Sequence, residues 1–205
     1  NLSNFYHKSK KLIVIHQSIN KTKINFSKKQ KSITFVGKLN TAKGYDIFGK
    51  TIIKILDKYP KWKATVIGDE PREKLFFEHK NLINLGFQNH KKVLETFSRT
   101  SIAVACSRWE EPFGRTSLEA ASRGCAVIIS NRGGLPETIT NGIILRKLSV
   151  NSLFLSIEKL IKHKKKLSFL QKESYKNFFL TDKYISEKID LYRDEICLRF
   201  KVNIK

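Results

Sequence analysis

The chain has 205 residues, 40% of them hydrophobic and 11% aromatic, enough for one large domain, or one domain with an appendage, around a buried core. No apolar run reaches the about 18–20 residues of a membrane span, and no Cys-x-x-Cys pair or Cys/His cluster has the spacing of a zinc site. The 40 Lys and Arg against 18 Asp and Glu give a net charge of +22, which favours anionic partners such as nucleic acid, anionic lipid headgroups or phosphorylated small molecules.

The first part of the chain, residues 1–31, is polar and rich in lysine. Its one short apolar run, residues 12–15, has the composition of a strand, and the polar tract that follows is typical of a linker. The chain contains no Met, even at its first position. We therefore expect a piece of a longer protein, with residues 1–31 as the remnant of a preceding domain and its linker.

From residue 33 onward, predicted strands and helices alternate. The strands are apolar, rich in β-branched residues and in several cases ended by glycine; they are expected at residues 33–37, 62–67, 82–85, 102–106, 125–130 and 143–145. The helices carry apolar residues at helical spacing; they are expected at residues 45–59, 71–77, 91–99 and 113–123. After Ser149 the chain is expected to be helical and basic, with a last helix at residues 182–200.

This alternation predicts an α/β fold, a doubly wound, Rossmann-like parallel sheet with helices on both faces and a helical C-terminal segment. The strands are continuous apolar runs, as expected when both faces of a sheet are covered. We expect residues 32–180 to form this domain and residues 181–205 to form a C-terminal helix and tail. Ligands of such sheets bind at the carboxyl ends of the strands, where Gly37, Gly68 and Gly86 and the turns after Ser107 and Asn131 lie.

Two lysines, Lys38 and Lys43, follow the first of these strand ends on a loop that leads into a helix. Their ammonium groups, together with the free N–H groups of a helix start, can hold a diphosphate. The spacing is not that of a Walker A loop, and the chain has no G-x-G-x-x-G. An ordinary pair of surface lysines is the alternative interpretation.

Two carboxylates, Glu111 and Glu119, are eight residues apart around a Pro-Phe-Gly turn and a helix start. Eight residues are about two helical turns, so Glu119 can face the same edge of the sheet as Glu111. Carboxylates accept hydrogen bonds from the vicinal hydroxyls of a ribose or a sugar. A second turn, at residues 133–137, completes this edge.

These pieces, in this order, resemble the C-terminal domain of the retaining glycosyltransferases of family 4, which have the two-domain GT-B fold. The resemblance covers roughly residues 11–197, and its most specific part is the E-x7-E element from Glu111 to Glu119. It implies that Lys43 and Lys38 contact the donor diphosphate, with lysine at position 38 where the family usually has arginine. It also implies that Glu119 binds the ribose hydroxyls and that Glu111 lies near the donor sugar.

The remaining donor-binding positions implied by the resemblance contact the base, the sugar or the phosphates; they are Gly37, Phe87, Gln88, Phe113, Gly114, Arg115 and Thr116. Lys38, Lys43 and Glu111 form the implied catalytic set. The implied reaction moves a sugar from a UDP- or GDP-sugar to an acceptor hydroxyl with retention, in glycan, lipopolysaccharide or glycolipid synthesis. No metal and no cofactor are expected, because the lysines and helix starts would stabilise the leaving diphosphate.

The resemblance also implies a partner that this chain lacks, the N-terminal domain with the acceptor site. A cytoplasmic location is expected from the reduced cysteines, and the basic tract at residues 159–166 is a candidate for contact with an anionic membrane surface. Two alternatives stay open: a basic nucleic-acid-binding domain, disfavoured because the lysines are spread along the chain, and a GT-B-like sugar-nucleotide epimerase or phosphorylase.

Overall fold

The computed structural model describes residues 13–200, and it contains two compact units. The larger unit is Thr22–Phe178; the other joins Asn1–Lys21 to Phe179–Lys205. The three-part organisation predicted from the sequence, with boundaries after residues 31 and 180, stays a prediction.

The larger unit is built on a sheet of six parallel strands in the order β3-β2-β1-β4-β5-β6. The strands are β1 (Ser32–Val36), β2 (Lys63–Ile67), β3 (Leu82–Asn84), β4 (Ile102–Ala105), β5 (Ala126–Ser130) and β6 (Gly142–Leu145). This is the strand order of a doubly wound fold, and it reverses direction between β1 and β4. The predicted fold class is confirmed.

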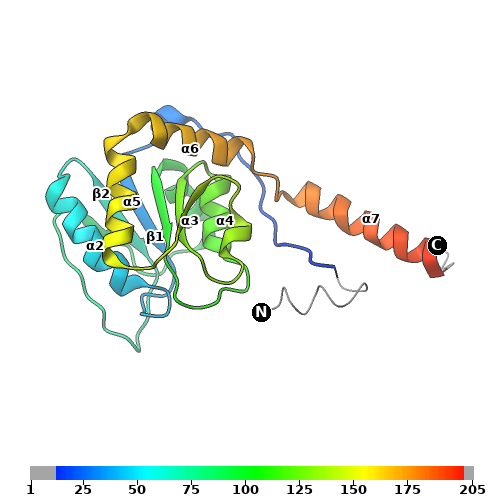
Figure 1. Ribbon diagram of the computed structural model, residues 1–205, viewed down its shortest axis with the longest axis horizontal. Helices are drawn as coiled ribbons and strands as arrows, with labels where there is room; N and C mark the ends of the chain where they lie inside the picture. Colours follow the sequence, from blue (N-terminus) through cyan, green and yellow to red (C-terminus); the bar gives the residue numbers. More distant parts are fainter. Residues whose placement is uncertain (1–12, 201–205) are drawn as a thin grey trace. The chain divides into compact units, whose positions relative to one another are not determined.

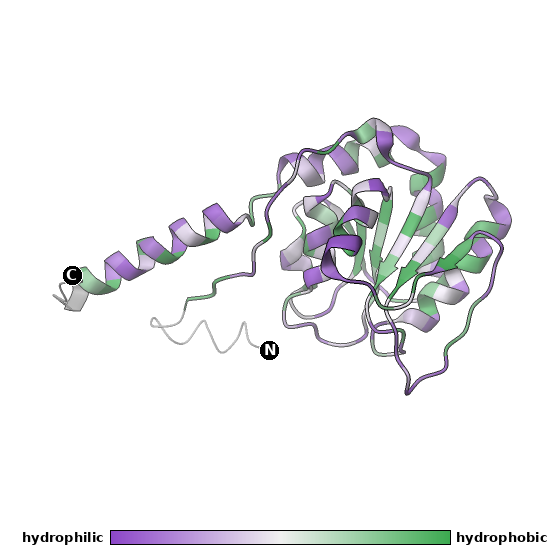
Figure 2. Ribbon diagram, turned by 180° about the vertical axis from the view of Figure 1, so that it is seen from behind, coloured by the Kyte–Doolittle hydropathy of each residue, from purple (hydrophilic) through white to green (hydrophobic). Residues whose placement is uncertain are grey.

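Helices cover both faces of this sheet, with α2 and α5 on one side of β1 and α3 and α4 on the other (Figure 1). They are α2 (Tyr45–Lys58), α3 (His90–Arg99), α4 (Arg115–Ser122), α5 (Val150–Lys162) and α6 (Lys164–Lys176), with short 3-10 turns η1 (Phe26–Lys28) and η2 (Leu135–Thr138). Ile33 and Phe35 of β1 pack in the α2 and α5 core. Figure 2 shows the strands as apolar and the outer helix faces as polar, as burial on both faces requires.

Three local predictions are wrong. Residues 71–77 form turns and an extended loop instead of a helix. The Phe77 ring packs 5.5 Å from the ring of Tyr45, and Glu73 accepts a hydrogen bond from the Thr41 N–H at 2.9 Å. These distant contacts outweigh a helix of barely two turns, because starting a helix is costly. Residues 13–15 form no strand, residue 12 lies outside the described part, and α4 starts at Arg115, two residues later than expected.

The second unit contains α7 (Asp182–Phe200), which confirms the predicted last helix. The segment that precedes α7 accepts a hydrogen bond at its Leu180 carbonyl from the Ile19 N–H, at 3.0 Å. Two apolar residues of α7, Ile189 and Ile196, are exposed. Within residues 13–200, no helix combines the length and the apolar character that crossing a membrane requires.

Candidate functional site

A cavity of about 220 Å³ opens at the carboxyl ends of β1 and β4, where the strand order reverses. Ligands of doubly wound sheets bind at this point. The lining comes from both strand ends, the loops that follow them and the start of α4; it consists of Phe35, Val36, Gly37, Lys43, Ala105, Cys106, Ser107, Glu111, Gly114, Arg115, Thr116 and Leu135.

On the β1 side, a tight turn at Gly44 places Lys43 at the mouth of the cavity. Gly44 has a φ of 75°, and a Cβ on it would lie 1.9 Å from the Cys106 carbonyl oxygen. Only glycine therefore lets the start of α2 approach the end of β4 this closely. The Asn40 side chain fixes the same loop by accepting a hydrogen bond from the Lys43 N–H at 2.9 Å.

On the β4 side, Glu111 faces Lys43 across the cavity. The Lys43 Nζ donates to Glu111 Oε1 at 2.5 Å and to Oε2 at 2.8 Å, and the Glu111 side chain is only 12% exposed. Loss of Lys43 from this partly buried pair would be costly, because the Glu111 charge would remain in a poorly solvated place. The pair thus joins two loops that were predicted from the sequence to lie at the same edge of the sheet.

The second turn predicted from the sequence, at residues 133–137, holds Glu111 from behind. The Gly134 N–H donates to the Glu111 carbonyl at 2.7 Å, and a Cβ on Gly133 would lie 2.2 Å from that carbonyl oxygen. Arg132 and the Gly133 N–H hydrogen-bond Glu110, and these two bonds lower the pKa of the Glu110 carboxyl. The Gly-Gly turn is therefore a support for the Glu110–Glu111 backbone.

The start of α4 supplies the third wall of the cavity. Gly114 is its N-cap, and no side chain caps the helix. The first N–H groups of α4, those of Arg115 and Thr116, therefore have no intrahelical acceptor. A helix start carries a partial positive charge, which adds to the charges of Lys43 and Arg115. This wall suits an anion such as a phosphate.

Glu119 lies one turn further along α4 and is almost fully buried, with 3% of its surface exposed. Its Oε1 accepts a hydrogen bond from Arg115 Nε at 2.9 Å and lies 2.9 Å from His90 Nε2. His90 was not among the site residues predicted from the sequence. The Asn89 N-cap and the preceding Gly86 strand end were the available signal, because a helix that starts there must begin at the same edge of the sheet.

Six of the eleven predicted site residues line the cavity, namely Gly37, Lys43, Glu111, Gly114, Arg115 and Thr116, and five do not. Glu119 reaches the cavity through Arg115. Lys38 and Phe87 are exposed and do not line the cavity, and the Gln88 side-chain amide donates to the Leu85 carbonyl at 2.7 Å. Phe113 is buried behind the turn. The roles of all these residues toward a donor stay predictions.

The chemistry of the cavity is that of anion and hydroxyl binding. Lys43, Arg115 and the helix start are donors to phosphate oxygens, and the carboxylates of Glu111 and Glu119 are acceptors for hydroxyl groups. The cavity's one thiol, Cys106, is no nucleophile, because burial raises its pKa to about 12. Within the described part of the chain, no group of three or more His, Cys, Asp or Glu is placed to hold a metal ion.

Comparison with known proteins matches this chain to one family. The model of the family described as glycosyl transferases group 1 covers residues 16–177. The crystal structure of the C-terminal domain of LpcC, a glycosyl transferase group 1 family protein from Francisella tularensis, superimposes with a TM-score of 0.64. Its identity is 28%, over 71% of this chain and 82% of that one.

Two further proteins are similar to this chain, the first over a smaller share of its own length and the second at a lower sequence identity. An uncharacterized 41.2 kDa protein in the cps region of Klebsiella pneumoniae is 34% identical over 131 residues, which are 62% of this chain and 35% of that protein. The pneumococcal O-GlcNAc transferase GtfA, solved with UDP and GlcNAc, shares the fold with a TM-score of 0.75 at 20% identity, over 87% of this chain and 38% of that one. The chain spans 33–39% of the length of the first three curated relatives it matches.

Proposed function

Because the chain belongs to the glycosyl transferases group 1 family, we propose that its larger unit binds a nucleoside-diphosphate sugar for transfer to an acceptor hydroxyl. The transfer proceeds with retention of the anomeric configuration and serves glycan, lipopolysaccharide or glycolipid synthesis. UDP is the preferred nucleotide of this proposal, since a transferase with the same fold was solved with UDP and GlcNAc. GDP is the other candidate.

The observation that carries the proposal is the Lys43–Glu111 pair at the point where the strand order reverses. A donor would replace each partner of this pair: phosphate oxygens would accept from Lys43, and sugar hydroxyls would donate to Glu111. Arg115 and the start of α4 lie on the same wall and would hold the second phosphate. Glu119 would then accept from the ribose hydroxyls.

In the proposed reaction the bond between the anomeric carbon and the diphosphate oxygen breaks, and a bond to the acceptor oxygen forms on the same face. The acceptor proton passes to the leaving diphosphate. Lys43, Arg115 and the α4 start stabilise the negative charge that grows on that diphosphate, a role worth about a few kcal/mol for each well-placed donor. Glu111 positions the donor sugar. No metal ion takes part in this proposal.

The acceptor would bind on a second domain that precedes this chain in the whole protein. The chain covers about a third of its curated relatives, which leaves room for such a domain in proteins of their length. The proposed location is cytoplasmic, with contact to an anionic membrane surface through the basic residues 159–166 where the acceptor is a lipid.

The whole protein tests the reaction without knowledge of the acceptor. Incubated with UDP-glucose alone, a retaining transferase slowly passes the sugar to water, and proton NMR should detect α-glucose before β-glucose. Early β-glucose would contradict retention. A new sugar nucleotide would identify an epimerase, and sugar 1-phosphate formed only with added phosphate would identify a phosphorylase.

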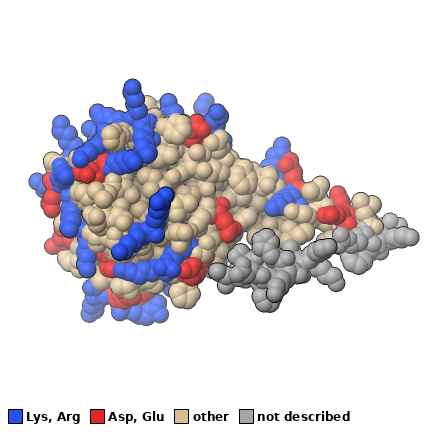
Figure 3. Space-filling model, viewed as in Figure 1, with Lys and Arg blue, Asp and Glu red and all other residues tan. Residues whose placement is uncertain are grey.

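Nucleic-acid binding is the alternative that the net charge of +22 favours. Figure 3 shows Lys and Arg spread over the visible face, with acidic residues between them, and not gathered over one element. Binding to unrelated oligonucleotides that weakens steeply with salt would support this alternative.

A further inference from the structure

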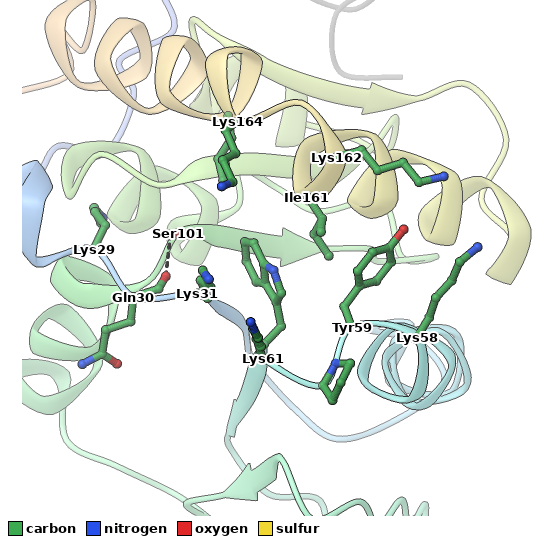
Figure 4. Close-up of a pocket in the computed structure, with 13 residues that line it drawn as sticks. Lys29, Gln30, Lys31, Lys58, Tyr59, Lys61, Ser101, Ile161, Lys162 and Lys164 are labelled. Atoms are coloured by element: carbon green, nitrogen blue, oxygen red, sulfur yellow. Dashed lines mark hydrogen bonds between the residues drawn. The ribbon is translucent and has the colours of Figure 1, made fainter.

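A second cavity, which we call the basal cavity, lies at the opposite edge of the sheet from the Lys43–Glu111 pair. Its volume is about 440 Å³, within the range of small-molecule sites. It lies among the segments that lead into β1, β2 and β4 and the junction between α5 and α6 (Figure 4). The glycosyl-transfer chemistry proposed above makes no use of this edge.

One part of the basal cavity is an apolar wall, made of Tyr59, Pro60, Trp62, Ile161 and Leu167. Trp62 is buried with 7% of its surface exposed and packs in the main core, so this wall is fixed by the fold. A rigid apolar surface of this kind favours a ligand with a hydrocarbon or aromatic body.

Three lysines of the cavity are already engaged. The Lys29 ammonium donates to the carbonyl oxygens of Phe97, Thr100 and Arg123 at 3.0, 2.8 and 2.7 Å, and burial lowers its pKa. Lys58 and Lys162 lie 2.8 and 3.3 Å from the Glu158 carboxylate. These three side chains already have hydrogen-bond or ion-pair partners within the fold.

The other three, Lys31, Lys61 and Lys164, are exposed and are here called the open lysines. Across residues 13–200 none of them has a carboxylate within ion-pair distance. In the view of Figure 4 the ammonium groups of the open lysines lie at one end of the basal cavity, and those of Lys58 and Lys162 lie at the other end. They come from three separate segments of the chain, so the fold itself gathers them.

The surroundings of the open lysines add positive charge. Lys164 is the first residue of α6, whose start has no side-chain cap. The partial charge of that helix start therefore adds to the three ammonium groups. An anion placed here would face all three ammonium groups and this helix start.

We propose that the basal cavity binds a small amphiphilic phosphate, with its apolar body on the apolar wall and its phosphate on the open lysines. Such a molecule is supplied either by a phospholipid or by a soluble phosphate ester with an apolar group. The site lies away from the Lys43–Glu111 cavity, so the inference does not depend on the glycosyl-transfer proposal.

The probe is decyl phosphate, titrated below its micelle concentration while tryptophan emission is recorded. The chain has two tryptophans, so all variants carry Trp109→Phe. The emission then comes from Trp62 alone, which lies in the apolar wall. We expect saturable binding, no comparable binding of inorganic phosphate or of neutral decyl maltoside, and weakening by salt. Equal binding of the neutral amphiphile, equal binding of inorganic phosphate, or no binding of decyl phosphate would each overturn the proposal.

Variants locate the binding. A triple variant should bind decyl phosphate at least about tenfold more weakly, since each change removes a charge-assisted contact; it combines Lys31→Gln, Lys61→Gln and Lys164→Gln. The matched control, Lys58→Gln with Lys162→Gln, removes two lysines of the same cavity and should leave affinity nearly unchanged. Leu167→Gln keeps every charge but makes the apolar wall more polar, so it should also lower the affinity for decyl phosphate. Unchanged affinity in the triple variant and in Leu167→Gln would place the ligand elsewhere and overturn the proposal.

Vesicles of phosphatidylglycerol distinguish the two sources of the ligand. A lipid source predicts that these vesicles change Trp62 emission in the wild type and not in the triple variant, whereas phosphatidylcholine vesicles have no effect. A soluble source predicts decyl phosphate binding without any vesicle response. Vesicle binding that persists in the triple variant, with no decyl phosphate binding, would assign the vesicle binding to general surface attraction by other residues and reject the cavity.

Discussion

Lys43 and Glu111, 68 residues apart in the sequence, meet across the cavity at the carboxyl ends of β1 and β4, where the Lys43 ammonium contacts both oxygens of the Glu111 carboxylate. Each residue neutralises the other in the free protein. A ligand that carries both phosphate and hydroxyl groups satisfies both of them at once, whereas phosphate alone leaves the carboxylate without a partner. This relation is the physical basis for proposing a nucleotide sugar over a simple anion.

Removal of the Lys43 ammonium is expected to weaken nucleotide-sugar binding. Lys43→Ala deletes a charged donor to the diphosphate, which is worth about 1.5–3 kcal/mol, or roughly tenfold or more in affinity. Isothermal titration calorimetry measures this change. Lys50→Ala, at an exposed position on α2, is the matched control and should bind as the wild type does. Equal losses in both variants would assign the effect to net charge.

Glu119 is expected to recognise the ribose. In the wild type, UDP should bind more tightly than 2′,3′-dideoxy-UDP, and Glu119→Gln should reduce this preference by about tenfold, because a neutral amide is a weaker acceptor for two hydroxyls. Glutamine keeps the size of the side chain among Arg115 and His90. Glu95→Gln, at an exposed position on α3, is the control. A preference that survives Glu119→Gln would remove the ribose role.

Gly44 is expected to be required for the turn that carries Lys43. Gly44→Ala places a Cβ against the Cys106 carbonyl in a backbone conformation that costs L residues about 1–2 kcal/mol by itself, so the total loss of unfolding free energy should exceed that figure. Gly86→Ala is the matched control, since Gly86 has a similar φ of 62° and open space around it. Urea unfolding of the two variants should show a clearly larger loss for Gly44→Ala.

Glu158 is expected to make stability depend on pH in the acid range. Its pKa is lowered from 4.5 to about 2, first by the hydrogen bond from Lys58 and then by that from Tyr59. The folded protein thus binds fewer protons than the unfolded chain, so the ionised carboxylate stabilises the fold above the unfolded pKa. That stabilisation is lost as the pH falls toward the folded pKa.

Glu158→Gln removes this contribution. The variant should be less stable than the wild type near pH 6, and the difference should shrink as the pH is lowered through about 4.5 toward about 3, because the wild type loses its advantage. Urea unfolding at several pH values measures the difference. Glu95→Gln should show no such change, and a difference for Glu158→Gln that stays constant with pH would contradict the prediction.

Much of the fold was predictable because the local signals agreed with the tertiary structure. The strands are apolar on both faces and end at glycines, so their burial, order of appearance and common edge could be predicted from the pattern around Gly37 and Gly68. The location of Lys43 and of the turn at Glu111 at one edge of the sheet was also predictable, because both follow parallel strands. The conformation of residues 71–77 was not predictable, since it depends on the packing of Phe77 against Tyr45, a contact that no local pattern encodes.

The finer parts of the candidate site were beyond the sequence for a similar reason. His90 reaches Glu119 only because α3 and α4 begin at the same edge of the sheet, and the pairing depends on side-chain direction. The basal cavity needs four segments of the chain, and the open lysines among them extend from Lys31 to Lys164, more than a hundred residues along the sequence. Charge composition predicted an anionic partner and could not place one.

The central claim, that the cavity between β1 and β4 binds a nucleoside-diphosphate sugar, is tested most directly by calorimetric titration of the folded chain with UDP-glucose, UDP-GlcNAc and GDP-mannose. We predict that at least one of them binds with one site per chain. We also predict that Lys43→Ala and Glu119→Gln weaken that binding while Lys50→Ala does not. A cooperatively folded chain that binds none of the three, or that binds one equally well in all variants, would contradict the claim.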